Sequence, residues 1–91
     1  MITYRIFYWG LEIGLLEINE QGQHRYTPIP ETTQQLSLAP FRVLETGQDW
    51  GPPIPLLQNR INNARRFHTE QDITSVTDHF RLLMAEGGAD A

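Results

Sequence analysis

The stretch "ITYRIFYWGLEIGLLEIN", residues 2–19, decides the fold, because its side chains alternate as those of two consecutive β-strands do. Gly10 lies between the two runs and supplies a turn residue that accepts a positive φ. Strict alternation in a segment rich in β-branched and aromatic residues is typical of strands. We therefore predict a β-hairpin. In its first strand Ile2, Tyr4, Ile6 and Tyr8 share one face, against Thr3, Arg5, Phe7 and Trp9. In its second strand Leu11, Ile13 and Leu15 alternate with Glu12, Gly14 and Leu16.

A third strand follows from "HRYT", residues 24–27, which comes after the turn cluster "NEQGQ" and stops at Pro28 and Pro30. Gly14 inside the second strand indicates a bulge or a close packing neighbour. From Pro30 to Gly51 the signal is poor, and we expect mostly irregular chain. Within it, "ETTQQL" is compatible with one helical turn, and "LAPFRVLETG" with a short strand or a short helix.

An amphipathic helix is predicted over about residues 54–67, where Asp49 is placed to cap it and prolines occupy the approach. Its apolar stripe recurs at steps of three and four residues and is expected to belong to the core: Ile54, Leu57, Ile61, Ala64 and Phe67. After the polar link "HTEQD", residues 76–84 alternate again. We predict a final strand there that joins the three-stranded meander.

The predicted fold class is α+β: an antiparallel β-meander plus a C-terminal strand, packed against one amphipathic helix. Ninety-one residues suffice for one domain, which we place at 1–86, with 87–91 as a flexible tail. There are no cysteines, so thiolate chemistry and Cys-based zinc sites are excluded. No apolar run is long enough to span a bilayer, and the N-terminus lacks a basic region followed by an apolar one. A cytoplasmic location is therefore expected.

The net charge of −4 is unevenly spread along the chain. Residues 50–69 carry three arginines and no acid, whereas the segments on either side are acidic. General nucleic-acid binding usually needs a strongly basic domain, so this balance argues against direct nucleic-acid contact. It suits one discrete anionic contact, or a basic helix face that is merely solvated.

The sequence offers only weak candidates for a catalytic or metal-binding cluster. His68, Glu70 and Asp72 are spaced to face one way on an extended segment, yet no second ligand pattern supports a metal, and a solvated linker explains them as well. Asp78 and His79 are neighbours in the predicted strand, so they face opposite ways and cannot form a catalytic pair. Glu12 and Glu17 are also predicted on opposite faces of one strand. We expect no enzyme, no cofactor and no bound metal.

The predicted function is a small, non-catalytic, regulatory module that binds another protein. Its contact surface is predicted at Trp50 and at the outward helix face with Arg60, Arg65 and Arg66, since aromatic and arginine side chains are typical interface anchors. Two alternatives stay open: a mobile-element-encoded inhibitor of a nucleic-acid-handling enzyme, whose acids at 70–78 mimic phosphates, and a small metal-binding protein. An exposed edge strand would equally support a homodimer.

Three stretches together resemble the N-terminal subdomain of HipA-type toxin kinases: "LEIGLLEINEQGQHRYTP", "QLSLAP" and "PIPLLQNRI". The resemblance covers about residues 4–62 and rests on Gly14, Gly22, residues 36–40 and Asn59, although the family's Leu-Leu-Pro is absent after Asn59. It implies a stand-alone accessory or antitoxin-like domain without a kinase domain, whose matching residues are structural. The chain is also similar to small proteins of Firmicutes, which implies a fold family but no activity.

Overall fold

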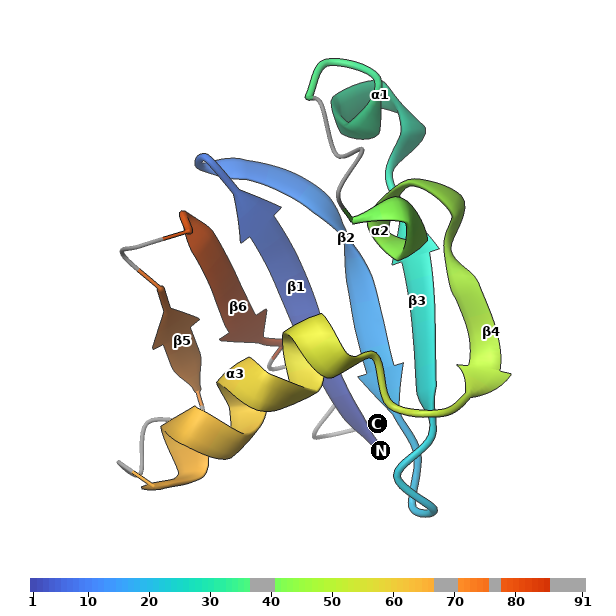
Figure 1. Cartoon of the computed structure of the whole chain (residues 1–91), viewed down its shortest axis with the longest axis vertical. Helices are drawn as coiled ribbons and strands as arrows, with labels where there is room; N and C mark the ends of the chain where they lie inside the picture. The colour runs from blue at the N-terminus through green and yellow to red at the C-terminus, as the bar shows by residue number, and fades with distance from the viewer. Residues whose placement is uncertain (37–40, 67–70, 76–77, 86–91) are drawn as a thin grey trace.

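The computed structural model describes residues 1–36, 41–66, 71–75 and 78–85 of the chain. It contains a six-stranded sheet in the order β4-β3-β2-β1-β6-β5, in which all neighbouring strands pair antiparallel. The predicted α+β class is thereby confirmed. Figure 1 shows the sheet and the helices, whose bounds are β1 Ile2–Tyr8, β2 Leu11–Ile18, β3 His24–Pro28, α1 Pro30–Thr33, α2 Arg42–Thr46, β4 Gln48–Gly51, α3 Pro55–Arg66, β5 Asp72–Thr74 and β6 Phe80–Met84.

The predicted hairpin forms between β1 and β2, and Trp9 and Gly10 make its two-residue turn. The register slips inside it: Ile6 lies opposite Gly14 and Phe7 opposite Glu12, so one residue of β2 has no partner. This β-bulge confirms the interpretation of Gly14. Because a bulge reverses the alternation of a strand, the segment before it and the segment after it follow opposite patterns.

The bulge corrects two predictions about β2. Ile13 and Leu16 are both buried, whereas Leu15, which was predicted to share a face with Ile13, is only half-buried opposite Arg5. Glu12 and Glu17 were predicted on opposite faces, but each lies opposite an outward-facing residue of β1 and both therefore lie on the same face. Residues directly opposite each other in an antiparallel pair share a face.

The described parts of the region 30–51 are more regular than its sequence indicates. The short helix α1 consists of Pro30 and the first three residues of "ETTQQL". The residues "RVLET" form α2 rather than a strand. Asp49 does not cap α3, because it belongs to β4, and α3 begins only at Pro55. The residue before α3 is Ile54, whose carbonyl accepts the first hydrogen bonds of the helix from Leu57 and Gln58.

The C-terminal part forms a hairpin instead of one strand over 76–84. β5 pairs with β6, and β6 pairs in turn with β1, which confirms that the last strand joins the meander. Asp78 and His79 lie before β6, and His79 has a positive φ, so the alternation predicted for them does not apply. Phe67, His68, Glu70, residues 37–40 and the predicted tail lie outside the described residues.

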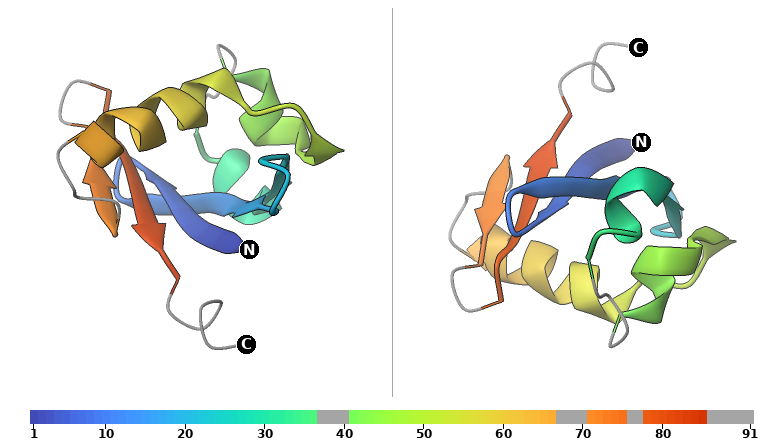
Figure 2. Two further views of the ribbon diagram at one scale, coloured as in Figure 1. Left: turned by 90° about the horizontal axis from the view of Figure 1, so that it is seen from below. Right: turned by 90° about the horizontal axis from the view of Figure 1, so that it is seen from above.

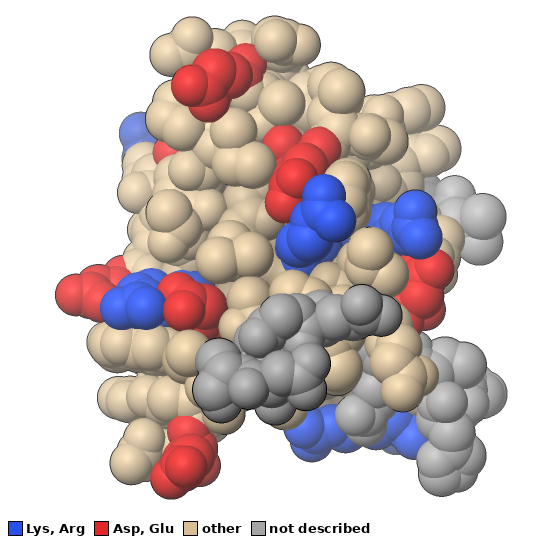
Figure 3. All heavy atoms as spheres, turned by 180° about the vertical axis from the view of Figure 1, so that it is seen from behind, with Lys and Arg blue, Asp and Glu red and all other residues tan. Residues whose placement is uncertain are grey.

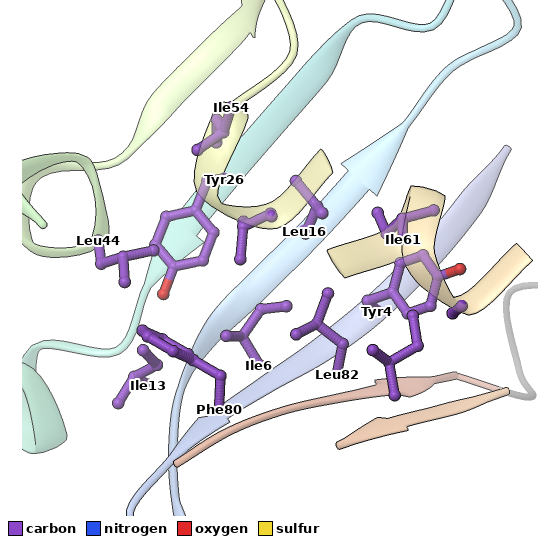
Figure 4. Close-up of a cluster of buried hydrophobic side chains, with 13 residues drawn as sticks. Tyr4, Ile6, Ile13, Leu16, Tyr26, Leu44, Ile54, Ile61, Phe80 and Leu82 are labelled. Carbon is purple, nitrogen blue, oxygen red and sulfur yellow. The ribbon is translucent and has the colours of Figure 1, made fainter. Parts of the chain in front are cut away.

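The buried side chains form one cluster to which the inner face of the sheet, α2 and α3 contribute (Figure 4), with these members: Tyr4, Ile6, Ile13, Leu16, Tyr26, Leu44, Ile54, Leu57, Ile61, Ala64, Ile73, Phe80 and Leu82. Both views in Figure 2 place α3 across one face of the sheet, from the side of β4 to the side of β5. No described helix has the length and apolar character needed to cross a bilayer. In the two views of Figure 2 none of the described helices crosses the opposite, outer face of the sheet.

Candidate protein-binding surface

Arg60 was predicted on the outward face of the helix, and this prediction is wrong. Its side chain is only 16% exposed and forms an ion pair with Asp78. The guanidinium also donates to the carbonyl of Leu56 and lies 4.9 Å from the centre of the Phe80 ring. Burial lowers the pKa of Arg60. Arg60 therefore borders the core stripe and joins α3 to the C-terminal hairpin.

The other predicted contact residues do not form one surface with it. Arg65 and Arg66 are exposed in the last turn of α3, on the side of β5. Trp50 belongs to β4 at the opposite edge of the sheet, where it is half-buried beneath the Arg25 guanidinium at 4.6 Å. The structure thus separates the aromatic residue from the basic end of the helix.

The outer face of the sheet carries a different set, which we call the Arg5–Phe7–Arg81 cluster. The side chains of Arg5 and Phe7 lie two residues apart on β1 and both face outward, and Arg81 lies opposite Phe7 on β6. The two guanidiniums lie 5.2 Å and 6.0 Å from the centre of the Phe7 ring, within the range of cation–π attraction. Phe7 is half-buried, and both arginines are exposed.

Each arginine of the cluster is held by a carboxylate from a neighbouring strand. Arg5 donates through Nε and Nη2 to Glu12, at 3.1 and 3.0 Å, and Arg81 donates in the same way to Asp72, at 3.1 and 2.9 Å. These bonds raise the pKa of both arginines, and the bond from Arg81 lowers the pKa of Asp72. The bidentate geometry fixes the two guanidiniums before any partner arrives.

The pairing leaves the outer edge of each guanidinium unused among the described residues. A guanidinium carries five N–H bonds, and Nη1 takes no part in the contacts with Glu12 or Asp72. Arg5 is also more exposed than its partner, at 45% against 31% for Glu12. Figure 3 shows this face, where acidic and basic side chains lie beside each other on a largely uncharged surface.

The tip of the β1–β2 hairpin presents a second unusual feature. Trp9 is 59% exposed, and its ring stacks on that of His79, with ring centres 3.5 Å apart. The backbone N–H of Trp9 donates to the backbone carbonyl of His79 at 3.1 Å. These two are the non-glycine residues with positive φ in the described part of the chain. Leu11, on the other side of Gly10, is also exposed.

His24 is fully buried and joins β3 to the start of α3. Its Nδ1 accepts a hydrogen bond from the Ile54 N–H at 3.1 Å, so its Nε2 is the donor toward Gln58 Oε1 at 3.0 Å. Desolvation lowers the pKa of His24. With both ring nitrogens engaged and no exposure, His24 serves the fold rather than a site.

Catalytic and metal-binding arrangements do not emerge among the described residues. These residues contain no group of three His, Cys, Asp or Glu side chains that fits a metal ion. Of the acids predicted at 70–78, Asp72 is engaged by Arg81 and Asp78 by Arg60, while Glu70 lies outside the described residues. Two shallow hollows are lined by Arg5, Leu83, Met84 and Ala85, and by residues of β3, β4 and the end of α2.

Sequence reasoning missed the cluster although a signal for it exists. Arg5 and Phe7 were predicted on the same face of the first strand, and Arg81 alternates with Phe80 and Leu82 on the last one. No protein-family model, curated protein or solved structure matches the chain. The resemblance to the HipA-type N-terminal subdomain therefore stays a prediction.

Proposed function

We propose that this chain is a non-catalytic protein-binding module that holds an acidic, amphipathic segment of a partner protein on the outer face of its sheet. The observation that carries the proposal is the Arg5–Phe7–Arg81 cluster, in which two exposed guanidiniums flank one aromatic ring. Arginine and aromatic side chains are enriched in protein interfaces and dominate their binding energy. In this proposal α3 covers one face of the sheet, and the partner segment covers the opposite, outer face.

The charges of the cluster favour an acidic partner. Glu12 and Asp72 occupy the inner edges of the guanidiniums, and the outer edges remain available for two further carboxylates. A segment that places carboxylates on both sides of an apolar stripe matches this pattern, because the stripe covers Phe7 while the carboxylates reach Arg5 and Arg81. Fixed guanidiniums lose little conformational entropy on binding, which favours affinity.

Nucleic acid fits the same surface less well. Affinity for nucleic acid depends on many cations that neutralise successive phosphates, whereas the cluster supplies two guanidiniums. The chain as a whole is acidic, with a net charge of −4.

A protein-binding module of this kind is suited to a regulatory role. An accessory or antitoxin-like domain, as the resemblance implies, acts by holding a partner protein rather than by chemistry. The alternative of a phosphate-mimicking acidic surface is less favoured, because Asp78 is half-buried and held by Arg60, so that Asp72 is the one exposed acid of this group in the described part of the chain.

The test uses a defined peptide pair. One amphipathic helical peptide carries a leucine stripe flanked by glutamates, and its control carries lysines in place of the glutamates. Binding to the full chain is measured by fluorescence anisotropy of the labelled peptide. We expect the glutamate peptide to bind and the lysine peptide not to bind. Equal binding of both peptides, or binding of neither, would overturn the proposal.

Two double variants locate the surface. R5Q/R81Q removes both guanidiniums of the cluster, and R65Q/R66Q removes the same charge from the end of α3. R5Q/R81Q is expected to weaken binding of the glutamate peptide about tenfold or more, since a charge-assisted hydrogen bond contributes about 1.5–3 kcal/mol. R65Q/R66Q should bind within about twofold of the wild type, a difference of roughly 0.4 kcal/mol. The opposite result would place the site on the helix. Thermal unfolding of each variant checks that it remains folded.

A further inference from the structure

The stacked pair Trp9–His79 is held in a conformation that its residue types disfavour. Trp9 has φ 54° and Gly10 has φ 79°, and both lie in the two-residue turn between β1 and β2. Positive φ at both positions is the pattern of a type I′ turn, for which Asn-Gly is the preferred dipeptide. His79, with φ 63°, adopts the left-handed region as well.

Burial does not account for this choice of residues. Trp9 keeps 59% of its surface exposed, so little of its large apolar area is removed from water in the folded chain. An exposed tryptophan at a position that favours asparagine costs conformational free energy without adding to the core. Strained residues of this kind gather at functional sites, where the strain positions a side chain for a partner.

The pair lies at the end of the proposed binding surface. Trp9 follows Phe7 by two residues on the β1 side, and His79 precedes Arg81 by two residues on the β6 side. Trp9 is exposed at the hairpin tip, and neither of the two described hollows is lined by it. An exposed aromatic side chain is suited to insert into an apolar site of a partner rather than to enclose a small molecule.

We propose that Trp9, supported by the stacked imidazole of His79, is the apolar anchor of the binding surface and packs against the leucine-like stripe of the same acidic segment. This inference rests on the proposed function and deepens it. Arg5 and Arg81 supply the charge recognition, and Trp9 supplies the apolar contact at one end. His79 is a positioning residue, because it acts through the orientation of the indole.

The fluorescence of Trp9 tests the inference directly. The variant W50F removes the other tryptophan, so the emission reports on Trp9 alone. On addition of the glutamate peptide we expect the emission to shift to shorter wavelength and its quenching by acrylamide to fall severalfold. A peptide in which glutamines replace the leucines should leave both quantities unchanged.

Two substitutions separate a binding role from a structural one. W9N gives the preferred Asn-Gly turn, and we expect it to keep or raise the melting temperature while binding of the glutamate peptide weakens about tenfold, or 1.4 kcal/mol. W9F keeps an aromatic side chain and should retain most of the affinity. H79N keeps a residue that tolerates positive φ, and should lose part of the affinity and lower the emission shift.

The outcomes distinguish the two proposals. If the peptide binds the wild type, R5Q/R81Q weakens that binding, W9N binds as tightly as the wild type, and the Trp9 emission of W50F does not change on addition of the peptide, the anchor is refuted while the proposed function stands. If the glutamate peptide does not bind the wild type, both proposals fail. A W9N variant that unfolds at markedly lower temperature would assign Trp9 a structural role and would also refute the anchor.

Discussion

Arg60 on α3 and Asp78 before β6 form an ion pair that joins the helix to the C-terminal hairpin. The guanidinium contacts three kinds of group: the Asp78 carboxylate, the Leu56 carbonyl and the ring of Phe80. The Asp78 carboxylate also accepts a hydrogen bond from the Phe80 N–H at 3.3 Å. The pair therefore fixes the chain that enters β6, on which Arg81 of the binding surface is carried.

Removal of one partner of this pair is predicted to destabilise the fold more than removal of both. Asp78→Ala leaves a half-buried guanidinium without its carboxylate, and Arg60→Met leaves the carboxylate alone. Each should cost about 1–3 kcal/mol of unfolding free energy, less than a fully buried pair because both side chains retain contact with water. Urea unfolding of the two single variants and the double variant measures the coupling. Strictly additive losses would contradict it.

Gly14 and Gly22 are predicted to resist substitution for different reasons. A Cβ on Gly14 would overlap the Tyr26 hydroxyl and lie 2.8 Å from the Thr27 carbonyl oxygen. A Cβ on Gly22 meets nothing within 4 Å, but the φ of that residue is 80°. Gly14→Ala should cost about 2–4 kcal/mol through overpacking, and Gly22→Ala roughly 1–2 kcal/mol through backbone strain.

Thermal and urea unfolding of both alanine variants measures these losses. The near-ultraviolet circular dichroism of Gly14→Ala should also change, because Tyr26 has to move, whereas that of Gly22→Ala should not. Equal losses with unchanged aromatic signals would contradict the steric explanation for Gly14.

The parts of the fold that local patterns determine were predictable. Alternation in residues 2–19 and the stripe of Leu57 and Ile61 identify the hairpin and the helix, because each pattern lies within one element. β4 and β5 were not predicted, since Gln48–Gly51 and Asp72–Thr74 are short and are strands only by pairing with β3 and β6. Long-range pairing leaves little trace in a short segment.

The sequence predicted the kind of candidate site, a protein contact, but not the residues that form it. Arginine and aromatic residues indicated a protein contact, but polarity alone placed Arg60 outside, whereas its position next to the core stripe brings it to Asp78. The bulge at Gly14 moved Glu17 to the outer face, which it shares with Glu12 and where it holds Arg25. Neither event is visible in a local pattern, because each depends on a partner from another strand or helix.

Tyr26→Phe is predicted to stabilise the protein. The Tyr26 hydroxyl is buried without a hydrogen-bond partner among the described residues, and burial raises the pKa of this phenol well above its usual value. In Figure 4 its oxygen is directed toward Ile13, inside the cluster of apolar side chains. Removal of an unpaired buried hydroxyl should raise the unfolding free energy by about 1 kcal/mol.

Tyr4→Phe is the matched control, since Tyr4 is equally buried but its hydroxyl is not among the buried atoms without a partner. We expect no gain from that substitution. Equilibrium unfolding in urea compares the two variants with the wild type. A loss of stability in Tyr26→Phe would indicate that the hydroxyl is hydrogen-bonded in solution, for example to a buried water.

His24 is predicted to make the fold sensitive to mild acid. In the folded chain its Nδ1 accepts from the Ile54 N–H, and a proton on Nδ1 would face that N–H and break the bond. Desolvation lowers the pKa of the folded residue, whereas the unfolded residue keeps a pKa of about 6.5. Between these two values the unfolded state binds more protons, so the unfolding free energy falls as the pH drops below about 6.5.

His24→Asn isolates this effect, because asparagine does not titrate. The variant should be less stable than the wild type at neutral pH, since the bonds to Ile54 and Gln58 are weakened or lost. Its unfolding free energy should nevertheless depend less on pH between about 7 and 5. The Asp72 carboxylate, whose pKa is lowered, contributes only in more acidic solution. Urea unfolding over a pH series measures both proteins, and an equal pH dependence in the two would show that another group governs the acid response.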